Sequence, residues 1–480
     1  MRNTGIVGIE SVGVVGLGTM GAGIAEVFAR SGLGVVAVEV DDALVEAGRR
    51  RITASLDRAV DRGRLEAAER DAVLSRLTFT ADRGRLASAD LVIEAVPERL
   101  ETKASLFDEL DRICPPATIL ATNTSSLPVT QIAAATGRAG RVVGMHFFNP
   151  APVMRLVEIV HTVLSDHDAV ESVRDLAARC GKTPVVVTDR AGFVANALLF
   201  GYLNQAARMA ETRHATTTDI DAAMTAACGL PMGPLSLMDL IGLDVCLEVL
   251  EVMYAETRDQ RYAAAPLLRR LVMARQLGRK TGRGYYSYED GAAEAVLSGG
   301  SQDPDEPHDV SAIRPTVTVA GMDDQLVADV TKSLTARFDL AADAAAADVV
   351  VHLPTAPRPG AVLELAPRTD VGRSVADDIA ASLQGDGRTV VVSKDRPGYI
   401  VEALLYPHLN DAARMVDDGY ASRADVDTAM RLGCGYPTGP FEMLDAVGAR
   451  VLVERLPDIA LSMPSPAVAV SALLRDLARR

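Results

Sequence analysis

His146 and Glu158 are the residues whose types and spacing best fit proton-transfer chemistry. His146 stands in the segment GMHFFNP, and Glu158 lies in VMRLVEI on the next predicted strand. Oxidation of an alcohol needs a base that takes the hydroxyl proton while a hydride leaves the same carbon, and a histidine held by a carboxylate meets that need. A lone histidine in a strand is more often structural. The position of the pair at the C-terminal edge of a predicted dinucleotide-type sheet favours a catalytic role over a structural one.

A glycine-rich loop near the N-terminus is the second segment that could do chemistry. It follows the apolar run 12–15, opens a helical pattern, and consists of Gly16, Leu17, Gly18, Thr19, Met20 and Gly21. Glycines at this spacing permit a tight turn and bring a pyrophosphate close to the helix N-terminus. Glu39, at the end of the next predicted strand, can bind ribose hydroxyls and would repel a 2′-phosphate. We therefore expect an NAD site, the alternative being a purely structural turn.

The segment NTSSL at 123–127 follows the apolar run TILAT at the same sheet edge. Ser126 is expected to form an N-cap or a Ser/Thr turn before the helix that begins near Val129. Ser125 could in addition bind a substrate hydroxyl, and spacing alone leaves that choice open.

A wound sheet is needed to bring these residues to one edge. From Val12 to Val187, short β-branched runs alternate with helical patterns, which predicts an α/β domain. The charged stretch 42–76 is longer than a minimal crossover requires, and we interpret it as a helical arm over the far end of the substrate. After Asp189 the strand signals stop, and apolar residues spaced about 3.6 apart predict a separate helical domain.

The helical domain occurs twice in the sequence. DRAGFVANALLFGYLNQAARM matches DRPGYIVEALLYPHLNDAARM, so that Gly192 faces Gly398, 206 residues later. The same offset pairs the Cys-Gly at 228–229 with the Cys-Gly at 434–435, and the Gly-Pro at 233–234 with the Gly-Pro at 439–440. So many matches in register indicate a duplication.

Upstream, this offset places His146 on His352 and Glu158 on Glu364. Other partners differ: Asn149 falls on Thr355, Asn196 falls on Glu402, and VTVAGMDD contains no GxGxxG. We therefore expect no second active site and interpret the surviving pair as a relic or a coincidence.

These patterns divide the 480 residues into five parts, since the chain is too long for a single core. We expect a Rossmann-type NAD-binding domain over 1–190 and a helical substrate and dimerisation-type domain over 191–290. A linker rich in Gly, Ser, Pro and acidic residues covers 291–312. A degenerate α/β segment over 313–390 and a second helical domain over 391–480, the repeat of 191–290, complete the chain.

Composition excludes several classes of protein. A net charge of −15 argues against a general nucleic-acid or membrane-surface binder, so an anionic substrate needs a local basic patch. The five cysteines form no CxxC pair, so we expect neither disulfides nor a metal site, in keeping with a reducing cytoplasm. Glu10 and Glu26 interrupt the apolar N-terminal stretch, which we interpret as a buried strand, turn and helix and not as a membrane segment.

Several segments together resemble the L-3-hydroxyacyl-CoA dehydrogenases in order and spacing. They span roughly residues 10–290 and read GLGTMGAGIA, NTSSLP, HFFNPAPVMRLVEIV, DRAGFVANALL and GRKTGRGYYSY. The resemblance implies NAD-dependent oxidation of a short L-3-hydroxyacyl-CoA, such as 3-hydroxybutyryl-CoA, to the 3-oxoacyl-CoA. It further implies that His146 is the base and Glu158 its partner. By the same resemblance, Ser125 contacts the substrate hydroxyl and Asn196 polarises the thioester carbonyl.

The resemblance also assigns binding residues. Besides the glycine loop, it places around NAD the residues Glu39, Glu98, Lys103, Ser125, Asn149 and Lys280. Ser55 and Arg62 match positions that touch CoA, Arg62 standing where the family can carry Lys. Without the resemblance, Glu98 and Lys103 would be interpreted as an exposed helical pair and Arg62 as solvated surface.

Alternative functions remain open at this point. The second half resembles the duplicated extension of longer family members, including 3-hydroxyadipyl-CoA dehydrogenases of phenylacetate breakdown. A gulonate-type sugar-acid dehydrogenase shares the two-domain plan, a free β-hydroxyacid dehydrogenase shares only the cofactor loop, and a silent NAD-binding protein is the alternative without catalysis. Because short family members pair two helical domains across a dimer, we expect residues 391–480 to pack on 191–290 as an internal pseudo-dimer. Further assembly into a homo-oligomer is left open.

Overall fold

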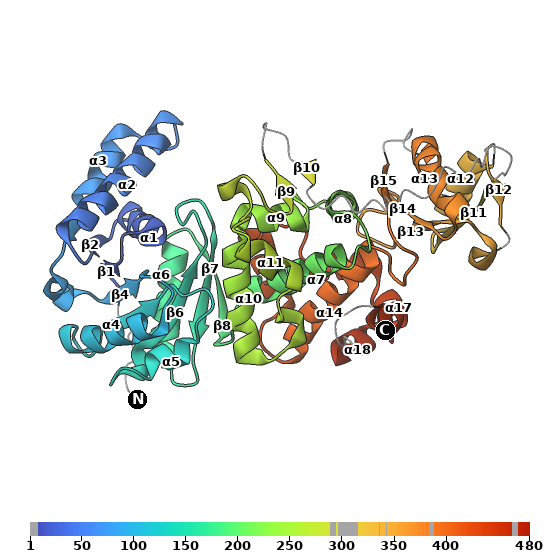
Figure 1. Ribbon diagram of the computed structural model, residues 1–480. Coiled ribbons are helices and arrows are strands. Elements are labelled where there is room, and N and C mark those ends of the chain that lie inside the picture. The colour runs from blue at the N-terminus through green and yellow to red at the C-terminus, as the bar shows by residue number, and fades with distance from the viewer. Residues whose placement is uncertain are drawn as a thin grey trace. The chain divides into compact units, whose positions relative to one another are not determined.

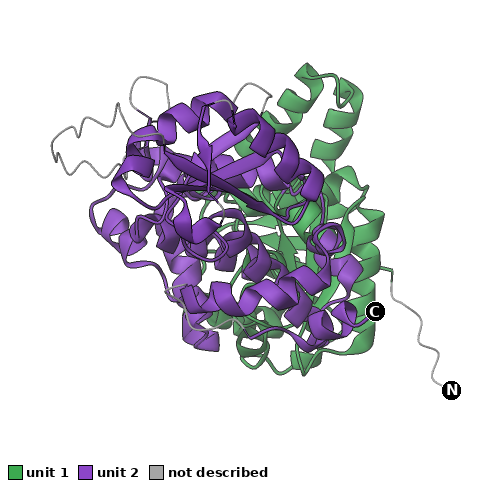
Figure 2. Ribbon diagram, turned by 90° about the vertical axis from the view of Figure 1, so that its right-hand side faces the viewer, with its two compact units in different colours: residues 1–196, 428–434 green, residues 197–427, 435–480 purple. Residues whose placement is uncertain are grey.

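The computed structural model describes residues 8–288, 294–295, 315–335, 337–341, 343–383, 388–462 and 469–480. The chain forms two compact units (Figure 2): the first is Met1–Asn196 with Thr428–Cys434, and the second is Ala197–Asp427 with Gly435–Arg480. Of the predicted linker 291–312, only Glu294 and Ala295 are described. They form β10, which pairs antiparallel with β9 (Tyr286–Ser287).

An eight-stranded sheet is the core of the first unit (Figure 1). Its strands are β1 (Ser11–Val15), β2 (Gly34–Val38), β3 (Leu77–Thr80), β4 (Leu91–Glu94), β5 (Ile119–Thr122), β6 (Val142–Phe147), β7 (Leu156–His161) and β8 (Thr183–Thr188), in the order β3-β2-β1-β4-β5-β6-β7-β8. All neighbours are parallel except β6 and β7. The predicted Rossmann-type α/β domain is confirmed. Sequence reasoning missed β3, because LTFT is a short edge strand that alternates apolar residues with threonine.

Helices cover this sheet, as the buried β-branched strands of a mostly parallel sheet require. They are α1 (Thr19–Arg30), α2 (Asp42–Asp61), α3 (Ala67–Ser75), α4 (Leu100–Ile113), α5 (Val129–Ala133) and α6 (His167–Arg179). The predicted helical arm at 42–76 is the pair α2 and α3 (Figure 1), and the Asp41 side chain caps α2 by accepting from the Leu44 amide.

Two matching sets of helices follow, confirming the duplication. The first set is α7 (Ala195–Glu211), α8 (Thr217–Cys228), α9 (Pro234–Ile241), α10 (Leu243–Thr257) and α11 (Pro266–Met273). The second is α14 (Val401–Asp417), α15 (Arg423–Gly433), α16 (Pro440–Val447), α17 (Ala449–Ser462) and α18 (Ala472–Ala478). Each helix of the second set begins 206 residues after its counterpart, as in 195 to 401 and 266 to 472.

A smaller sheet lies in the second unit. Its strands are β11 (Thr316–Gly321), β12 (Asp339–Leu340), β13 (Val349–Leu353), β14 (Val362–Pro367) and β15 (Thr389–Val392), in the order β12-β11-β13-β14-β15, with helices α12 (Asp324–Leu334) and α13 (Asp370–Leu383). The run β11-β13-β14-β15 repeats the strand directions of β5-β6-β7-β8. His352 pairs with Glu364 across β13 and β14, just as His146 pairs with Glu158. This shared register favours a relic over a coincidence.

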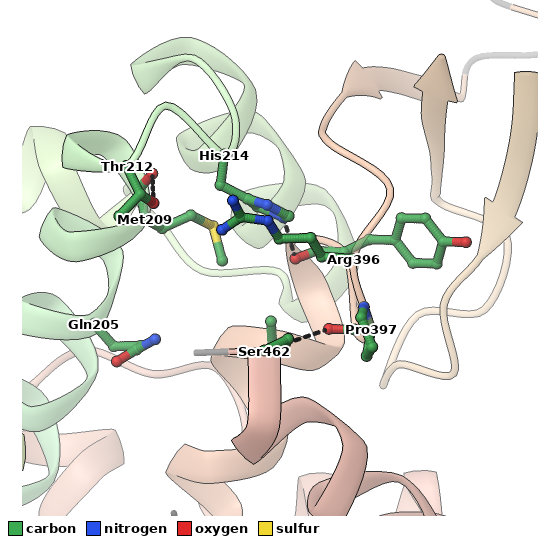
Figure 3. Close-up of a pocket in the computed structure, with 9 residues that line it drawn as sticks. Gln205, Met209, Thr212, His214, Arg396, Pro397 and Ser462 are labelled. Carbon is green, nitrogen blue, oxygen red and sulfur yellow. Dashed lines mark hydrogen bonds between the residues drawn. The ribbon is translucent and has the colours of Figure 1, made fainter. Parts of the chain in front are cut away.

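The two helical sets pack against each other inside the second unit. The ring of Tyr202 on α7 lies 5.5 Å from that of His408 on α14, and Arg261 forms a 2.5 Å ion pair with Asp411. Figure 3 shows a small pocket lined by residues of both halves of the second unit, among them His214 and Arg396. His214 Nε2 lies 2.8 Å from the Tyr399 carbonyl oxygen. Burial lowers the pKa of His214 to about 4, so the ring is neutral there. The second repeat thus buries a face of the first within one chain.

In the part of the chain that the structure describes, no helix has the length and apolar character needed to cross a membrane.

Candidate active site

Strands β6 and β7 bring His146 and Glu158 together. His146 Nδ1 lies 2.7 Å from Glu158 Oε2, and both side chains are buried. The other carboxylate oxygen, Oε1, accepts hydrogen bonds from the Val194 and Ala195 amides at 3.0 Å each. Glu158 is therefore fixed from two sides and holds the imidazole by Nδ1, which leaves Nε2 as the nitrogen for proton transfer.

A strained turn after β8 presents those two amides to Glu158. Gly192 has φ 78°, a conformation that favours glycine, and Phe193 follows with φ 47°. The ring of Phe193 lies 5.6 Å from the imidazole of His146, and the ring of Phe148 lies 4.5 Å from it. The turn thus supplies both the amide donors and part of the aromatic wall around His146.

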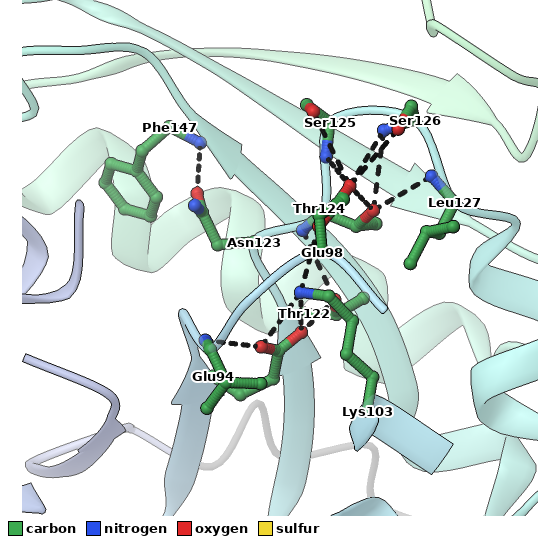
Figure 4. Close-up of polar contacts among 11 residues, drawn as sticks. Glu94, Glu98, Lys103, Thr122, Asn123, Thr124, Ser125, Ser126, Leu127 and Phe147 are labelled. Atoms are coloured by element: carbon green, nitrogen blue, oxygen red, sulfur yellow. Dashed lines mark hydrogen bonds and ion pairs between the residues drawn. The ribbon is translucent and has the colours of Figure 1, made fainter. Parts of the chain in front are cut away.

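Glu98 organises the NTSS loop, as Figure 4 shows. One of its oxygens accepts from the Thr124 hydroxyl at 2.5 Å, from the Ser125 amide at 2.9 Å and from the Ser126 amide at 3.2 Å. The Asn196 amide group, at the start of α7, donates to the Ser125 carbonyl at 3.4 Å. The structure therefore brings Glu98, Ser125 and Asn196 into one cluster.

Lys103 lies beneath this loop and is only 1% exposed. Its Nζ lies 2.7 Å from Glu94 Oε1 and 3.2 Å from Glu98 Oε2. Burial alone would raise the pKa of Glu98, but the Lys103 charge and the Thr124 and Ser125 donors outweigh it and hold that pKa below its ordinary value. Interpreting Glu98 and Lys103 as an exposed helical pair is therefore wrong.

Of the two roles expected for Ser126, the N-cap of the following helix is not formed. Helix α5 begins after Pro128, and its first two amides, of Val129 and Thr130, donate to the carboxylate of Asp189 at 3.0 and 2.6 Å. A residue distant in sequence replaces the local cap, and Ser126 serves the Glu98 network instead.

The glycine loop has the geometry of a pyrophosphate cradle. Gly16 has φ 90°, and a Cβ there would stand 2.8 Å from the Ala95 carbonyl oxygen. A Cβ at Gly21 would overlap Gly16, whereas a Cβ at Gly18, directly before α1, would meet nothing within 4 Å. The closed positions allow the tight turn, and the open one leaves room at the helix N-terminus, so these residues fit a dinucleotide.

Glu39 lies at this loop. Its Oε1 accepts from the Leu17 amide at 2.6 Å and its Oε2 from the Val40 amide at 3.1 Å. The predicted ribose acceptor thus stands beside the pyrophosphate cradle. Lys280, also predicted to bind NAD, belongs to the second unit and forms an ion pair with Asp244 at 2.5 Å.

A basic groove runs between α1, α2 and the loop after β6. Ser55 lines it, as does the exposed Asn149, together with Arg50, Arg51 and Arg58. Arg62 is exposed at the end of α2 and is not among the lining residues of this groove. Sequence reasoning missed the three arginines. The spacing could have indicated two of them, because it places Arg51 and Arg58 on one helix face with Ser55. The groove provides the local basic patch that an anionic substrate requires.

Among the described residues, no cluster of three or more His, Cys, Asp or Glu could hold a metal ion.

Comparison with protein families identifies both parts of the chain. The model of the 3-hydroxyacyl-CoA dehydrogenase NAD-binding domain matches residues 11–190. The model of the 3-hydroxyacyl-CoA dehydrogenase C-terminal domain matches twice, at residues 192–288 and 398–480. The second match agrees with the duplicated helices.

Individual relatives cover either the first part or nearly the whole chain. The 3-hydroxybutyryl-CoA dehydrogenase of Mycobacterium tuberculosis is 49% identical over 58% of this chain and 99% of its own length. The 3-hydroxyadipyl-CoA dehydrogenase of Escherichia coli is 38% identical over 91% of this chain and 90% of its own. A crystal structure of 3-hydroxybutyryl-CoA dehydrogenase from Escherichia coli, at 31% identity, matches with a TM-score of 0.81 over 98% of this chain and 99% of that one.

Proposed function

The chain belongs to the 3-hydroxyacyl-CoA dehydrogenase family and is an NAD-dependent oxidoreductase, and from this premise we propose that His146 and Glu158 oxidise the 3-hydroxyl of a short L-3-hydroxyacyl-CoA. The observation that carries the proposal is the buried pair itself, with its 2.7 Å contact and with Nε2 left for the substrate. The proposal assigns a domain plan to the chain. Residues 1–190 bind NAD and residues 191–290 form the substrate domain. The degenerate α/β segment 313–390 precedes the second helical domain at 391–480.

Oxidation of the 3-hydroxyl removes a proton from the oxygen and a hydride from C3. NAD, when bound, supplies the acceptor for the hydride from C3. His146 Nε2 takes the proton of the 3-hydroxyl, so that the C–O bond becomes a carbonyl and the imidazole becomes a cation. Glu158 stabilises that cation through Nδ1, and the Val194 and Ala195 amides keep the carboxylate from turning away.

The remaining site residues position the reactants. The Ser125 hydroxyl binds the substrate hydroxyl, and the Asn196 amide, held near the Ser125 carbonyl, polarises the thioester. Gly16 to Gly21, Glu39, Glu98 and Asn149 hold NAD, and the family resemblance adds Lys280 to the NAD-binding residues. Lys103 holds Glu98 in place, because its buried ammonium forms ion pairs with both Glu94 and Glu98. Ser55 and the arginines of its groove bind the CoA phosphates, and Arg62 extends this charge along α2.

The acyl chain has two candidates. A four-carbon chain is favoured by the 49% identical relative, whose name gives 3-hydroxybutyryl-CoA. A dicarboxylyl chain is the second, because the relative that matches 91% of this chain, including the duplicated half, is named for 3-hydroxyadipyl-CoA. Kinetics across acyl-CoA substrates from four to ten carbons, with one dicarboxylate, decide between them.

The test of the proposed base is His146→Gln. Turnover of acetoacetyl-CoA with NADH should fall by about 10²–10⁴, the usual contribution of a general base, while NADH binding, followed by fluorescence, stays nearly intact. Near-wild-type turnover would remove His146 from the mechanism.

Assays of free hydroxy acids and sugar acids beside acetoacetyl-CoA exclude or establish the two rival dehydrogenase activities. NADH binding without any turnover would indicate an NAD-binding protein without catalysis.

A further inference from the structure

The first unit contains a short piece of the C-terminal half. Residues Thr428–Cys434 group with Met1–Asn196, whereas the rest of the second helical repeat groups with the other unit. The piece is the end of α15 and the residue that follows it. The first unit is therefore completed by a segment more than 200 residues downstream in the sequence.

Gly433, the last residue of α15, packs against the walls of the His146 site. A Cβ at Gly433 would stand 2.7 Å from Leu156 Cδ2 and 3.1 Å from Cε1 of the Phe148 ring. Leu156 is fully buried and begins β7, two residues before Glu158. The Phe148 ring lies 4.5 Å from the imidazole of His146. Any side chain at position 433 would push on both neighbours of the catalytic pair.

Cys434 touches the other support of the pair. Its Sγ lies 4.0 Å from the carbonyl oxygen of Ala195, whose amide donates to Glu158. Burial, and then the nearby Glu158 charge, raise the pKa of the Cys434 thiol, which is therefore neutral and serves as a small packing group. The end of α15 thus contacts Leu156, two residues before Glu158 on β7, and Ala195, whose amide donates to Glu158.

The duplication offers an internal comparison. Gly433 corresponds to Ala227 of the first repeat, and Phe148 corresponds to Pro354 of the second α/β half, each 206 residues apart. Ala227, at the end of α8, also lies against the α/β half of the other repeat, because its carbonyl accepts from the Arg358 amide at 3.0 Å. Alanine favours helix more than glycine does, so helix formation does not explain the glycine at 433. The Leu156 side chain and the Phe148 ring, which a Cβ at 433 would meet, account for it.

We propose that Gly433, with Cys434, is a positioning residue for the His146–Glu158 pair, acting through Phe148 and Leu156. The inference rests on the proposed function, since it takes His146 as the base. This proposal gives the second repeat a role in the reaction. The sequence of the C-terminal half has no glycine loop of its own, but the end of α15 positions the side chains that pack around His146.

The test is Gly433→Val in the full-length chain. We expect kcat for acetoacetyl-CoA reduction to fall by about 10–100-fold, the scale of a misplacement near 1 Å, while KM and NADH binding change less than about threefold. Ala424→Val, at an exposed position on the same helix, is the matched control and should keep wild-type kcat. Adding Phe148→Leu to Gly433→Val removes ring bulk and should restore part of kcat, which a general loss of stability would not produce.

Circular dichroism and thermal unfolding establish that each variant is folded. Should Gly433→Val not fold, Gly433→Ala, which adds only the Cβ, is expected to lower kcat by several-fold with rescue by the same Phe148→Leu change. A folded Gly433→Val with wild-type kcat, or an equal loss in Ala424→Val, overturns the inference. If His146→Gln is inactive while Gly433→Val is normal, the inference fails and the proposed function stands; an active His146→Gln sinks the proposed function itself.

Discussion

Replacing Lys103 by Met should leave two carboxylates inside the first unit without their counter-charge. Methionine keeps the length of the side chain and removes the ammonium that lies 2.7 Å from Glu94 and 3.2 Å from Glu98. Glu94 is fully buried, and the Glu98 side chain is 28% exposed. Removing one partner of a buried pair costs about 3–5 kcal/mol. For a unit of this size the melting temperature should fall by roughly 6–20 °C.

The loss should depend on pH with a definite sign. In the native protein the pKa of Glu98 lies below its ordinary value of 4.5. Ionised Glu98 therefore stabilises the folded state above pH 4.5, and this stabilisation is lost as the pH falls through the folded pKa. In Lys103→Met, burial is no longer opposed by the ammonium and the pKa of Glu98 rises. The variant then takes up a proton on folding, and its deficit shrinks as the pH is lowered from about 8 to about 5.

Thermal unfolding at several pH values measures both effects. Arg112→Met is the matched control, because Arg112 lies on the same helix, α4, in an exposed pair with Asp108 and should change stability by less than about 0.5 kcal/mol. Adding Glu94→Gln to Lys103→Met removes one uncompensated charge and should recover much of the loss. A Lys103→Met protein that melts within about 2 °C of wild type near neutral pH would refute the argument.

Three further predictions follow from the same structure. Glu39→Gln with Val40→Arg should raise the ratio of kcat/KM for NADP to kcat/KM for NAD, because the carboxylate that repels a 2′-phosphate is lost and an exposed guanidinium is added at position 40, where Val40 is 64% exposed. An unchanged ratio would mean that another acidic residue binds the ribose. His352→Ala should keep steady-state rates and lower the melting temperature, because His352 Nε2 lies 3.3 Å from the buried Glu402; a large loss of activity in the folded variant would reveal a second functional centre. A chain cut to residues 1–299 loses the Arg261–Asp411 pair and the Tyr202–His408 contact, so light scattering should find dimers or aggregates, and a soluble monomer with full activity would show that the second repeat does not cover that face.

The elements and the central pair were predictable because their signals are local. Apolar β-branched runs, glycine spacing and a helical repeat can all be read within short windows. His146 and Glu158 lie at neighbouring strand positions, so predicting the two strands was nearly enough to pair them. The duplication was visible as a fixed offset, which survives wherever no residue has been inserted.

What escaped prediction depends on partners distant in sequence. The sequence around Lys103, which follows a Pro-Glu turn, predicts an exposed lysine. The side chain is buried because Glu94, at the end of β4, provides its counter-charge. The cap of α5 comes from Asp189, about 60 residues later, and not from the adjacent Ser126. The sequence shows that a second repeat exists, but it contains no sign that Gly433 meets Phe148.

The two copies of the histidine pair differ in a way that bears on the proposed base. Glu364 accepts from the Ile400 and Val401 amides at 2.9 Å each, repeating the support of Glu158. His352, however, turns Nε2 toward carboxylates, 3.8 Å from Glu364 and 3.3 Å from Glu402.

Glu402 stands where the first copy has Asn196, and Arg455 holds it from the other side at 3.2 Å. Burial raises the pKa of Glu364 to about 7, although the nearby His352 opposes the rise. The strand register and the amide support are thus shared by both copies and cannot by themselves make a base. The difference lies in which imidazole nitrogen faces a carboxylate. It is Nδ1 in His146, which leaves Nε2 for the hydroxyl proton of the proposed reaction, and Nε2 in His352, which lies 3.3 Å from Glu402.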